Sequence, residues 1–178
     1  MIETEIKIKV DDFKNIQKKL NSFGAKKISS VFEKNIVFDT EKKELKKKDC
    51  FLRVREDKKA TLCFKGPREK TNTKKREEIE FEILDAKKAE QFLMRLGFDK
   101  KLRYEKNRES WDFKKTEIVL DELPFGKFIE IEGNEKDINA AAKILGYNKK
   151  EFITKTYFEL AEEAGIKKDI IFGDDTNG

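Results

Sequence analysis

Apolar and charged residues alternate along several short segments of the chain, beginning with its first ten residues. Ile6, Ile8 and Val10 take even positions there, whereas Glu5 and Lys7 take odd positions. A period of two is typical of a β-strand with one apolar and one charged face. Alternation or a short apolar run predicts strands at about 1–10, 27–39, 51–55, 60–65, 76–84, 101–113, 117–121 and 127–132.

Apolar residues spaced three or four apart predict helices between these strands. Asp or Asn side chains precede the first three helices, where they can accept hydrogen bonds from free backbone N–H groups. A glycine follows each helix, where it can adopt the left-handed conformation that ends one. The expected helices cover about 13–23, 86–96, 135–145 and 154–163, and the polar stretch 66–75 is expected to be a loop.

Length and composition favour one folded domain. The 178 residues suit a single domain with a sizeable core, which we expect over residues 1–165, followed by a C-terminal tail over residues 166–178. Charged residues make up 43% of the chain, yet 15 Phe are spread along it, and a disordered chain would lack them. Lys and Arg outnumber Asp and Glu by 41 to 36, which mildly favours anionic partners.

The residue types that are missing limit the chemistry. Histidine is absent, which removes the commonest zinc ligand and the commonest general base. Cys50 and Cys63 form no CxxC motif and, with no signal peptide apparent, are expected to be reduced thiols of a cytoplasmic protein. No apolar run approaches the length of a membrane span. Any catalysis would therefore use carboxylates, lysines or a bound metal ion.

The polar face of the strands is mostly fully charged, and the two signs are segregated along the sequence. Residues i and i+2 of a strand lie on one face, roughly 7 Å apart, so a Glu-x-Glu pair can offer two carboxylates to one site. Several such pairs around one lumen would bind a hard cation, and neighbouring Arg and Lys would hold phosphate oxygens. The pairs are Glu3/Glu5, Glu78/Glu80, Glu130/Glu132, Arg53/Arg55 and Lys106/Arg108.

Two folds account for this alternation. The charged positions can cover the solvated face of an open sheet, or they can line a closed barrel, which also removes the exposed edges of about eight strands. The pattern alone favours neither fold. The phase is unclear in 101–113, because Arg103 lies out of phase with Lys106 and Arg108, so we expect a bulge or a late strand start there.

Glu3-Thr4-Glu5-Ile6-Lys7 opens a series of motifs that continues in order to about residue 162. Eight further motifs follow, among them Leu52 to Arg55, Leu62 to Pro67 and Gly126 to Glu132. The series resembles the CYTH domains, the triphosphate tunnel metalloenzymes, and is most similar to their class IV adenylyl cyclase branch. The resemblance implies an α+β fold: a closed eight-stranded antiparallel β-barrel, the triphosphate tunnel, with helices packed outside.

The resemblance also implies which charged residues act in the tunnel. Lys7 and Glu5 would be catalytic, with Lys7 positioning or deprotonating the nucleophile. The acidic residues would bind Mg²⁺ or Mn²⁺, namely Glu3, Glu5, Glu130 and Glu132, with Asp121, Glu78 and Glu80 assisting. The basic residues would bind the triphosphate, namely Arg53, Arg55, Lys65, Lys106 and Arg108, with Arg76 and Lys155 as further members or as structural partners of a tunnel glutamate.

Two reactions fit such a site. In an adenylate cyclase, the ribose 3′-hydroxyl of ATP attacks the α-phosphorus and pyrophosphate leaves. In a triphosphatase, water attacks the terminal phosphorus of tripolyphosphate, thiamine triphosphate or a nucleoside triphosphate. The branch resemblance favours the cyclase. A third hypothesis, a non-catalytic module for polyphosphate or nucleic acid, is disfavoured because acidic pairs repel phosphate without metal. No membrane partner is expected, and a homodimer is left open.

Overall fold

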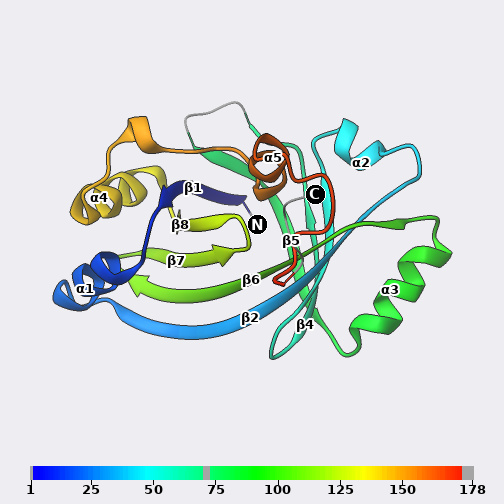
Figure 1. Cartoon of the computed structure of the whole chain (residues 1–178), viewed down its shortest axis with the longest axis horizontal. Helices are drawn as coiled ribbons and strands as arrows, with labels where there is room; N and C mark the ends of the chain where they lie inside the picture. Colours follow the sequence, from blue (N-terminus) through cyan, green and yellow to red (C-terminus); the bar gives the residue numbers. More distant parts are fainter. Residues whose placement is uncertain (1, 70–72, 174–178) are drawn as a thin grey trace.

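The computed structural model describes residues 2–69 and 73–173 of the chain. Its strands pair in antiparallel fashion and close into a barrel in the order β1-β5-β4-β3-β2-β6-β7-β8 (Figure 1). The expected closed barrel is therefore confirmed, and the open sheet with one solvated face is excluded. Met1, residues 70–72 of the expected loop and residues 174–178 of the expected tail lie outside the described residues.

The strands of the barrel wall end within two residues of the bounds expected from the sequence. β5 begins at Lys74, two residues earlier than expected and inside the segment expected to be a loop. The pairing of β6 with β2 skips Lys101 but is regular from Leu102 to Arg108, and β6 starts at Asp99. Neither the expected bulge between Arg103 and Lys106 nor a late strand start is present, so Arg103 lies on the opposite face from Lys106 and Arg108. The strands are β1 (Ile2–Val10), β2 (Lys26–Asp39), β3 (Phe51–Glu56), β4 (Ala60–Lys65), β5 (Lys74–Ile83), β6 (Asp99–Phe113), β7 (Thr116–Leu123) and β8 (Gly126–Glu132).

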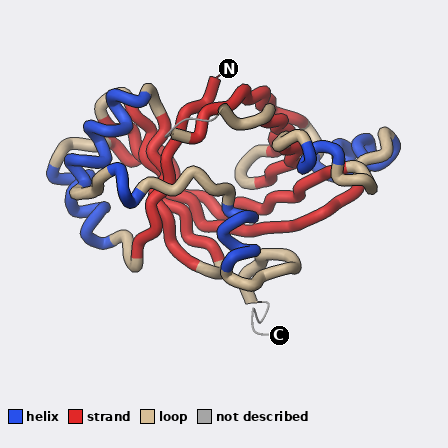
Figure 2. Tube along the Cα trace, turned by 90° about the horizontal axis from the view of Figure 1, so that it is seen from above, coloured by secondary structure: helices blue, strands red, loops and turns tan. Residues whose placement is uncertain are grey.

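Helices cover parts of the barrel wall and one of its ends (Figures 1 and 2). In the described ranges, none of them combines the length and apolar character needed to cross a membrane. One short helix, α2, was not expected, because a single turn is too short to display a helical period. The helices are α1 (Lys14–Ser22), α2 (Glu44–Lys47), α3 (Ala86–Arg95), α4 (Glu135–Leu145) and α5 (Tyr157–Glu163), with a 3-10 helix, η1 (Lys149–Glu151).

Side-chain caps fix where three of the five described α-helices begin. Asp85 and Asn134 accept hydrogen bonds from backbone N–H groups at the starts of α3 and α4, as expected. α5 begins at Tyr157, three residues later than expected, because Thr156 is its cap. The Thr156 hydroxyl accepts from the Glu159 N–H, and the Glu159 carboxylate accepts from the Thr156 N–H, which forms a capping box.

Apolar packing outside the wall turns the charged strand faces inward. Ile6 and Ile8 of β1 are buried in a cluster with residues of α1 and α4, and Leu52 of β3 belongs to a second cluster with α3. Successive side chains of a strand point to opposite faces. Because Ile6 and Ile8 face the helices, Glu5 and Lys7 face the barrel interior.

A third apolar cluster fills one end of the interior. Along β8 the inward side chains change from Glu132 and Glu130 to the buried Phe128. Tyr157 of α5 packs edge-on against Phe128, with the ring centroids 5.2 Å apart. Ile170, beyond α5, is also buried in this cluster. The barrel interior therefore has a charged part and an apolar end that α5 covers.

Candidate functional site

The barrel interior contains a cavity of about 610 Å³ that is lined mainly by charged side chains. Seven of the eight strands contribute to its wall, and Thr156, Tyr157 and Phe158 lie at its apolar end. The fold thus brings most of the sequence-predicted site residues to one place. Those that line the cavity are Glu3, Glu5, Lys7, Arg53, Arg55, Lys65, Arg76, Glu78, Glu80, Lys106, Arg108, Glu130 and Glu132.

Three carboxylates converge in this cavity. Oxygen atoms of Glu3, Glu5 and Glu132 lie within 4.8 Å of one another. Burial, together with the Glu5 and Glu130 carboxylates, raises the pKa of Glu132 to about 8, and burial and Glu5 also raise the pKa of Glu3. Carboxylates that repel one another in this way are suited to a divalent cation with oxygen ligands, such as Mg²⁺ or Mn²⁺. Glu3, Glu5 and Glu132 would hold that ion.

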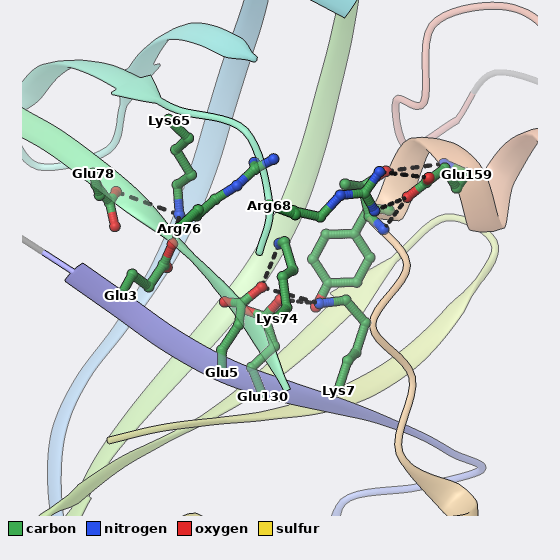
Figure 3. Close-up of polar contacts among 12 residues, drawn as sticks. Glu3, Glu5, Lys7, Lys65, Arg68, Lys74, Arg76, Glu78, Glu130 and Glu159 are labelled. Carbon is green, nitrogen blue, oxygen red and sulfur yellow. Dashed lines mark hydrogen bonds and ion pairs between the residues drawn. The ribbon is translucent and has the colours of Figure 1, made fainter. Parts of the chain in front are cut away.

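Two lysines neutralise part of this group (Figure 3). The Lys65 ammonium lies 2.7 Å from both carboxylate oxygens of Glu3, and the buried Lys74 ammonium pairs with Glu5. Burial opposes ionisation of Glu5, but Lys74 and the other nearby lysines outweigh it and hold its pKa at about 2. Within the described ranges, Glu132 has no ion pair of this kind. Lys74 was missed in the sequence because its position reads as a polar loop.

Lys7 lies at the centre of the cavity wall and is almost fully buried. Its ammonium pairs with Glu130, lies 4.0 Å from Glu5 and lies 4.3 Å from the centroid of the Tyr157 ring. Burial opposes protonation of Lys7, but Glu130 and Glu5 outweigh it, so its pKa is raised. Lys7 is therefore an ammonium ion in the ligand-free protein.

Asp121 points into the barrel interior beneath the side chains that line the cavity, where it holds two of the cavity cations. Its carboxylate accepts from Lys106 at 2.9 Å and from Arg108 Nε at 2.7 Å. The Tyr157 hydroxyl donates to the same carboxylate at 2.8 Å. Asp121 is predicted from the sequence to assist metal binding, but it is fully buried and does not join Glu3, Glu5 and Glu132.

A family model for the CYTH domain matches residues 1–157, which is most of the chain and includes the strands that line the cavity. This chain belongs to the CYTH domain family. The family is metal-dependent in general, which agrees with the converging carboxylates of this CYTH domain.

Some proteins similar to this CYTH domain carry names that refer to adenylate cyclase. A protein of Methanocaldococcus jannaschii named as a candidate adenylate cyclase is 34% identical over 172 residues, covering 90% of this chain and 98% of the relative. A solved structure from Pyrococcus horikoshii is 30% identical, with a TM-score of 0.75, and covers 91% of this chain and 99% of that one. A Hippeastrum structure described as an adenylyl cyclase candidate with a dominant triphosphatase activity has the same fold, with 18% identity, a TM-score of 0.69 and coverage of 92% and 95%.

Arginines and acids from β3 and β5 form another part of the CYTH cavity. Arg55 donates to Glu80 at 2.6 Å, and Arg53 donates to Glu80 at 3.2 Å and to the Tyr104 hydroxyl at 3.0 Å. Glu78 lies 3.4 Å from Lys65, and the Cys63 thiol lies 3.1 Å from Glu78. Glu78 and Glu80 are thus paired with cations, and with Cys63 they offer a second set of ligand atoms within 4.8 Å of one another.

Glu33 is an acidic residue of the CYTH site that was missed in the sequence. It is buried on β2, and its carboxylate lies 3.5 Å from Lys106, 3.7 Å from Arg108 and 4.0 Å from Arg55. Burial opposes its ionisation, but these cations outweigh burial and hold its pKa at about 2. The surrounding residues 31–34 show no clean alternation, so the sequence contained no signal that Glu33 faces inward.

Two predicted phosphate-binding residues differ in their placement. Arg76 lines the cavity and donates to the backbone carbonyl of Asp49 at 3.1 Å. Lys155 lies outside the cavity, with its ammonium 2.5 Å from Glu163 and about half of its side chain exposed. The Lys155 assignment came from a motif match next to α5, where the backbone directs this side chain away from the barrel.

A second cavity of about 400 Å³ adjoins the first. The two share Phe51, Arg76, Thr156 and Phe158 as lining residues, so they are separated by single side chains. Arg68 forms one wall, where it donates to Glu159 (Figure 3). It also donates to Asp49. This CYTH domain therefore has additional space beside its charged cavity.

Proposed function

We propose that this CYTH domain is a metal-dependent enzyme that converts ATP to cyclic AMP and pyrophosphate, the class IV adenylate cyclase reaction. The observation that carries the proposal is the cavity, where Glu3, Glu5 and Glu132 converge beside several buried cations. Phosphoryl chemistry depends mainly on charge neutralisation and alignment, and it needs no covalent nucleophile. The carboxylates and cations of this cavity would supply both the charge neutralisation and the alignment, in a chain without histidine.

The charged side chains would divide the work between metal and phosphate. A bound Mg²⁺ or Mn²⁺ ion would neutralise phosphate charge and stabilise the leaving pyrophosphate. Arg53 and Arg55 on one side, and Lys106 and Arg108 on the other, would donate charge-assisted hydrogen bonds to phosphate oxygens. Glu33 and Asp121 would hold these cations in place.

Lys7 would orient the attacking hydroxyl group. Its raised pKa, caused by Glu130 and Glu5 against the effect of burial, makes it a hydrogen-bond donor in the ligand-free protein. In this protonated state Lys7 would position the attacking hydroxyl group and would not deprotonate it. The reaction forms a bond between the ribose O3′ and the α-phosphorus, breaks the bond from the α-phosphorus to the bridging oxygen, and releases the hydroxyl proton to solvent.

The second cavity supports a substrate with an organic group. Its lining includes apolar side chains such as Val37, Phe38 and Leu102, and it adjoins the charged cavity at Phe51. A nucleoside attached to the triphosphate would have room there, whereas inorganic tripolyphosphate would leave it empty. The name of the Methanocaldococcus jannaschii relative points to the same reaction.

A triphosphatase is the second candidate, and the description of the Hippeastrum structure favours it. In that reaction water attacks the terminal phosphorus and orthophosphate leaves. The same acids and cations would serve, because the two reactions differ mainly in which phosphorus faces the nucleophile.

Product analysis distinguishes the two candidates. The protein is incubated separately with ATP, tripolyphosphate and thiamine triphosphate, with Mg²⁺ and then Mn²⁺, and products are separated by chromatography. Cyclic AMP with pyrophosphate from ATP is the expected result. Orthophosphate without a cyclic product would replace the cyclase by the triphosphatase. The double variant Glu3→Gln/Glu5→Gln, folded by circular dichroism, should form no product in either case.

A further inference from the structure

We propose that a divalent cation and a triphosphate bind this chain cooperatively, through exchange of the ion pairs that Lys65 and Lys74 form with Glu3 and Glu5. In the ligand-free protein these lysines occupy the carboxylates. When the cation takes their place, the lysines become available to the phosphate chain. This inference rests on the proposed function, because it assumes that metal and triphosphate share the cavity.

The ion pairs involve the atoms that metal binding would use. Lys65 contacts both oxygens of Glu3 at 2.7 Å, and Lys74 contacts an oxygen of Glu5 (Figure 3). Glu3 and Glu5 each contribute one oxygen atom to the group within 4.8 Å that also includes Glu132. A carboxylate engaged by an ammonium ion at this distance has fewer lone pairs to offer a metal. Each lysine therefore competes directly with the cation.

Exchange preserves the charge balance of a buried site. Lys74 is buried and Lys65 is largely so, and an unpaired charge in such a place is strongly destabilising. A divalent cation replaces two ammonium charges beside Glu3 and Glu5. Once displaced, Lys65 and Lys74 no longer pair with Glu3 and Glu5. Phosphate oxygens can then take the place of these carboxylates as partners of the lysines.

The same argument holds in the opposite direction. A triphosphate that draws Lys65 and Lys74 towards it leaves Glu3 without its paired lysine and, among the described residues, Glu5 with only Lys7, 4.0 Å away, and a metal ion compensates for that loss. By linkage, each ligand must strengthen binding of the other by the same factor. The inference also assigns a phosphate contact to Lys74, which lies outside every motif of the family resemblance.

Isothermal titration calorimetry measures the coupling. Mn²⁺ is titrated alone, tripolyphosphate is titrated with metal removed, and each is then titrated with the other at saturation, after correction for their complex in solution. We expect each to bind at least about fivefold more tightly in the presence of the other. If neither binds, the proposed function fails. If both bind independently, only the cooperative exchange fails.

Direct attraction between metal and phosphate also produces coupling, so variants must isolate the lysines. In Lys65→Met and Lys74→Met, binding of Mn²⁺ alone should tighten several-fold, tripolyphosphate alone should bind more weakly, and the coupling factor should fall. Arg55→Met is the matched control, since Arg55 is a cavity cation that pairs with Glu80. It should weaken tripolyphosphate binding without tightening Mn²⁺ binding. Unchanged or weaker Mn²⁺ binding in both lysine variants would overturn the exchange.

A measurement on the unmodified protein covers the case in which a variant does not fold. Side-chain ¹⁵N spectra of lysine ammonium groups are recorded before and after Mg²⁺ is added alone. The Lys65 and Lys74 signals should move, whereas the Lys106 signal, whose partner is Asp121, should stay in place. Stationary Lys65 and Lys74 signals under conditions where calorimetry shows bound Mg²⁺ would contradict the proposal.

Discussion

The acids and bases of the cavity hold one another in place before any ligand arrives. Asp121 accepts from both Lys106 and Arg108, and Glu80 accepts from both Arg53 and Arg55. Each of these two carboxylates thus holds two basic side chains that lie two residues apart on the same strand. Preorganised donors lose less conformational entropy when a phosphate binds, so the network prepares the cations for an anionic ligand.

Loss of a single cavity arginine should weaken triphosphate binding. Arg53→Ala and Arg55→Ala each remove charge-assisted contacts worth about 1.5–3 kcal/mol, measurable by calorimetry with tripolyphosphate. Arg103→Ala and Lys155→Ala are the controls, because these side chains pair with Asp169 and Glu163 away from the cavity. Equal affinity of all four variants would show that the inward-facing arginines do not contact phosphate.

Glu132 should make the metal-free protein less stable at high pH. Burial, with Glu5 and Glu130, raises its pKa to about 8, so its neutral form is favoured on folding. The stability that this provides is complete below the ordinary glutamate pKa of 4.5 and is lost as pH rises through about 8. With metal chelated, Glu132→Gln should therefore raise the melting temperature at pH 9 by roughly 4–8 °C, or about 2 kcal/mol.

The same substitution should have little effect at pH 4, where Glu132 is neutral. Glu77→Gln, at an exposed position of β5, is the control at both pH values. Thermal unfolding followed by circular dichroism gives the comparison. A melting temperature of Glu132→Gln that is no higher than that of the parent at pH 9 would contradict the prediction.

Alternation along the strands predicted most of the cavity residues but not all of them. Arg53 and Arg55 could be placed together because their segment alternates cleanly. Glu33 could not, because its segment lacks that pattern, and Lys74 could not, because strand pairing with β1 extends β5 into a polar stretch. Lys155 was predicted to bind phosphate because it belongs to a family motif, but the backbone before α5 directs its side chain outward, to Glu163.

The start of α5 determines where the apolar end of the cavity lies. Its capping box sets Tyr157 as the first helical residue, and the Tyr157 hydroxyl reaches Asp121. The spacing of apolar residues predicted a helix here but placed its start at 154. That spacing carries no information on which residue caps the helix. Helix bounds at α3 and α4 were predicted well, since Asp85 and Asn134 are unambiguous caps.

Removal of the α5 cap should destabilise the protein. Thr156→Ala deletes the hydroxyl that accepts from the Glu159 N–H, at a cost of about 0.5–2 kcal/mol in the free energy of unfolding. Urea denaturation followed by fluorescence measures the change. Thr154→Ala, which precedes the helix, is the matched control. Two variants of equal stability would show that the capping box contributes nothing measurable.

Closure of the barrel places the charged side chains in a confined interior. Charge alternation could not distinguish that arrangement from a solvated sheet, because both place alternate residues on one face. The ordered motifs did distinguish them, since their spacing matches a family with a closed fold. Inside such a cavity, burial and neighbouring carboxylates raise the pKa of Glu3 and Glu132, whereas paired lysines hold the pKa of Glu5 at about 2.

Activity should depend on a divalent metal ion. Excess EDTA should abolish turnover of the triphosphate substrate, because the lysines that pair with Glu3 and Glu5 neutralise these acids but cannot coordinate phosphate oxygens as a metal ion would. Mg²⁺ or Mn²⁺ added in excess over the chelator should restore turnover, as followed by product chromatography. Full turnover in excess EDTA would exclude a metal-dependent reaction.

β1 completes the barrel through partners that lie far along the chain. It pairs with β5 and with β8, and the Lys7–Glu130 contact joins residues 123 positions apart. During synthesis β1 leaves the ribosome long before β8, so Ile6 and Ile8 have α1 nearby but lack their partners in β8 and α4 for most of that time. Contacts across such a long loop form slowly. The charged interior is therefore assembled late in folding, and chaperone contact with the newly made β1 would protect the chain until then.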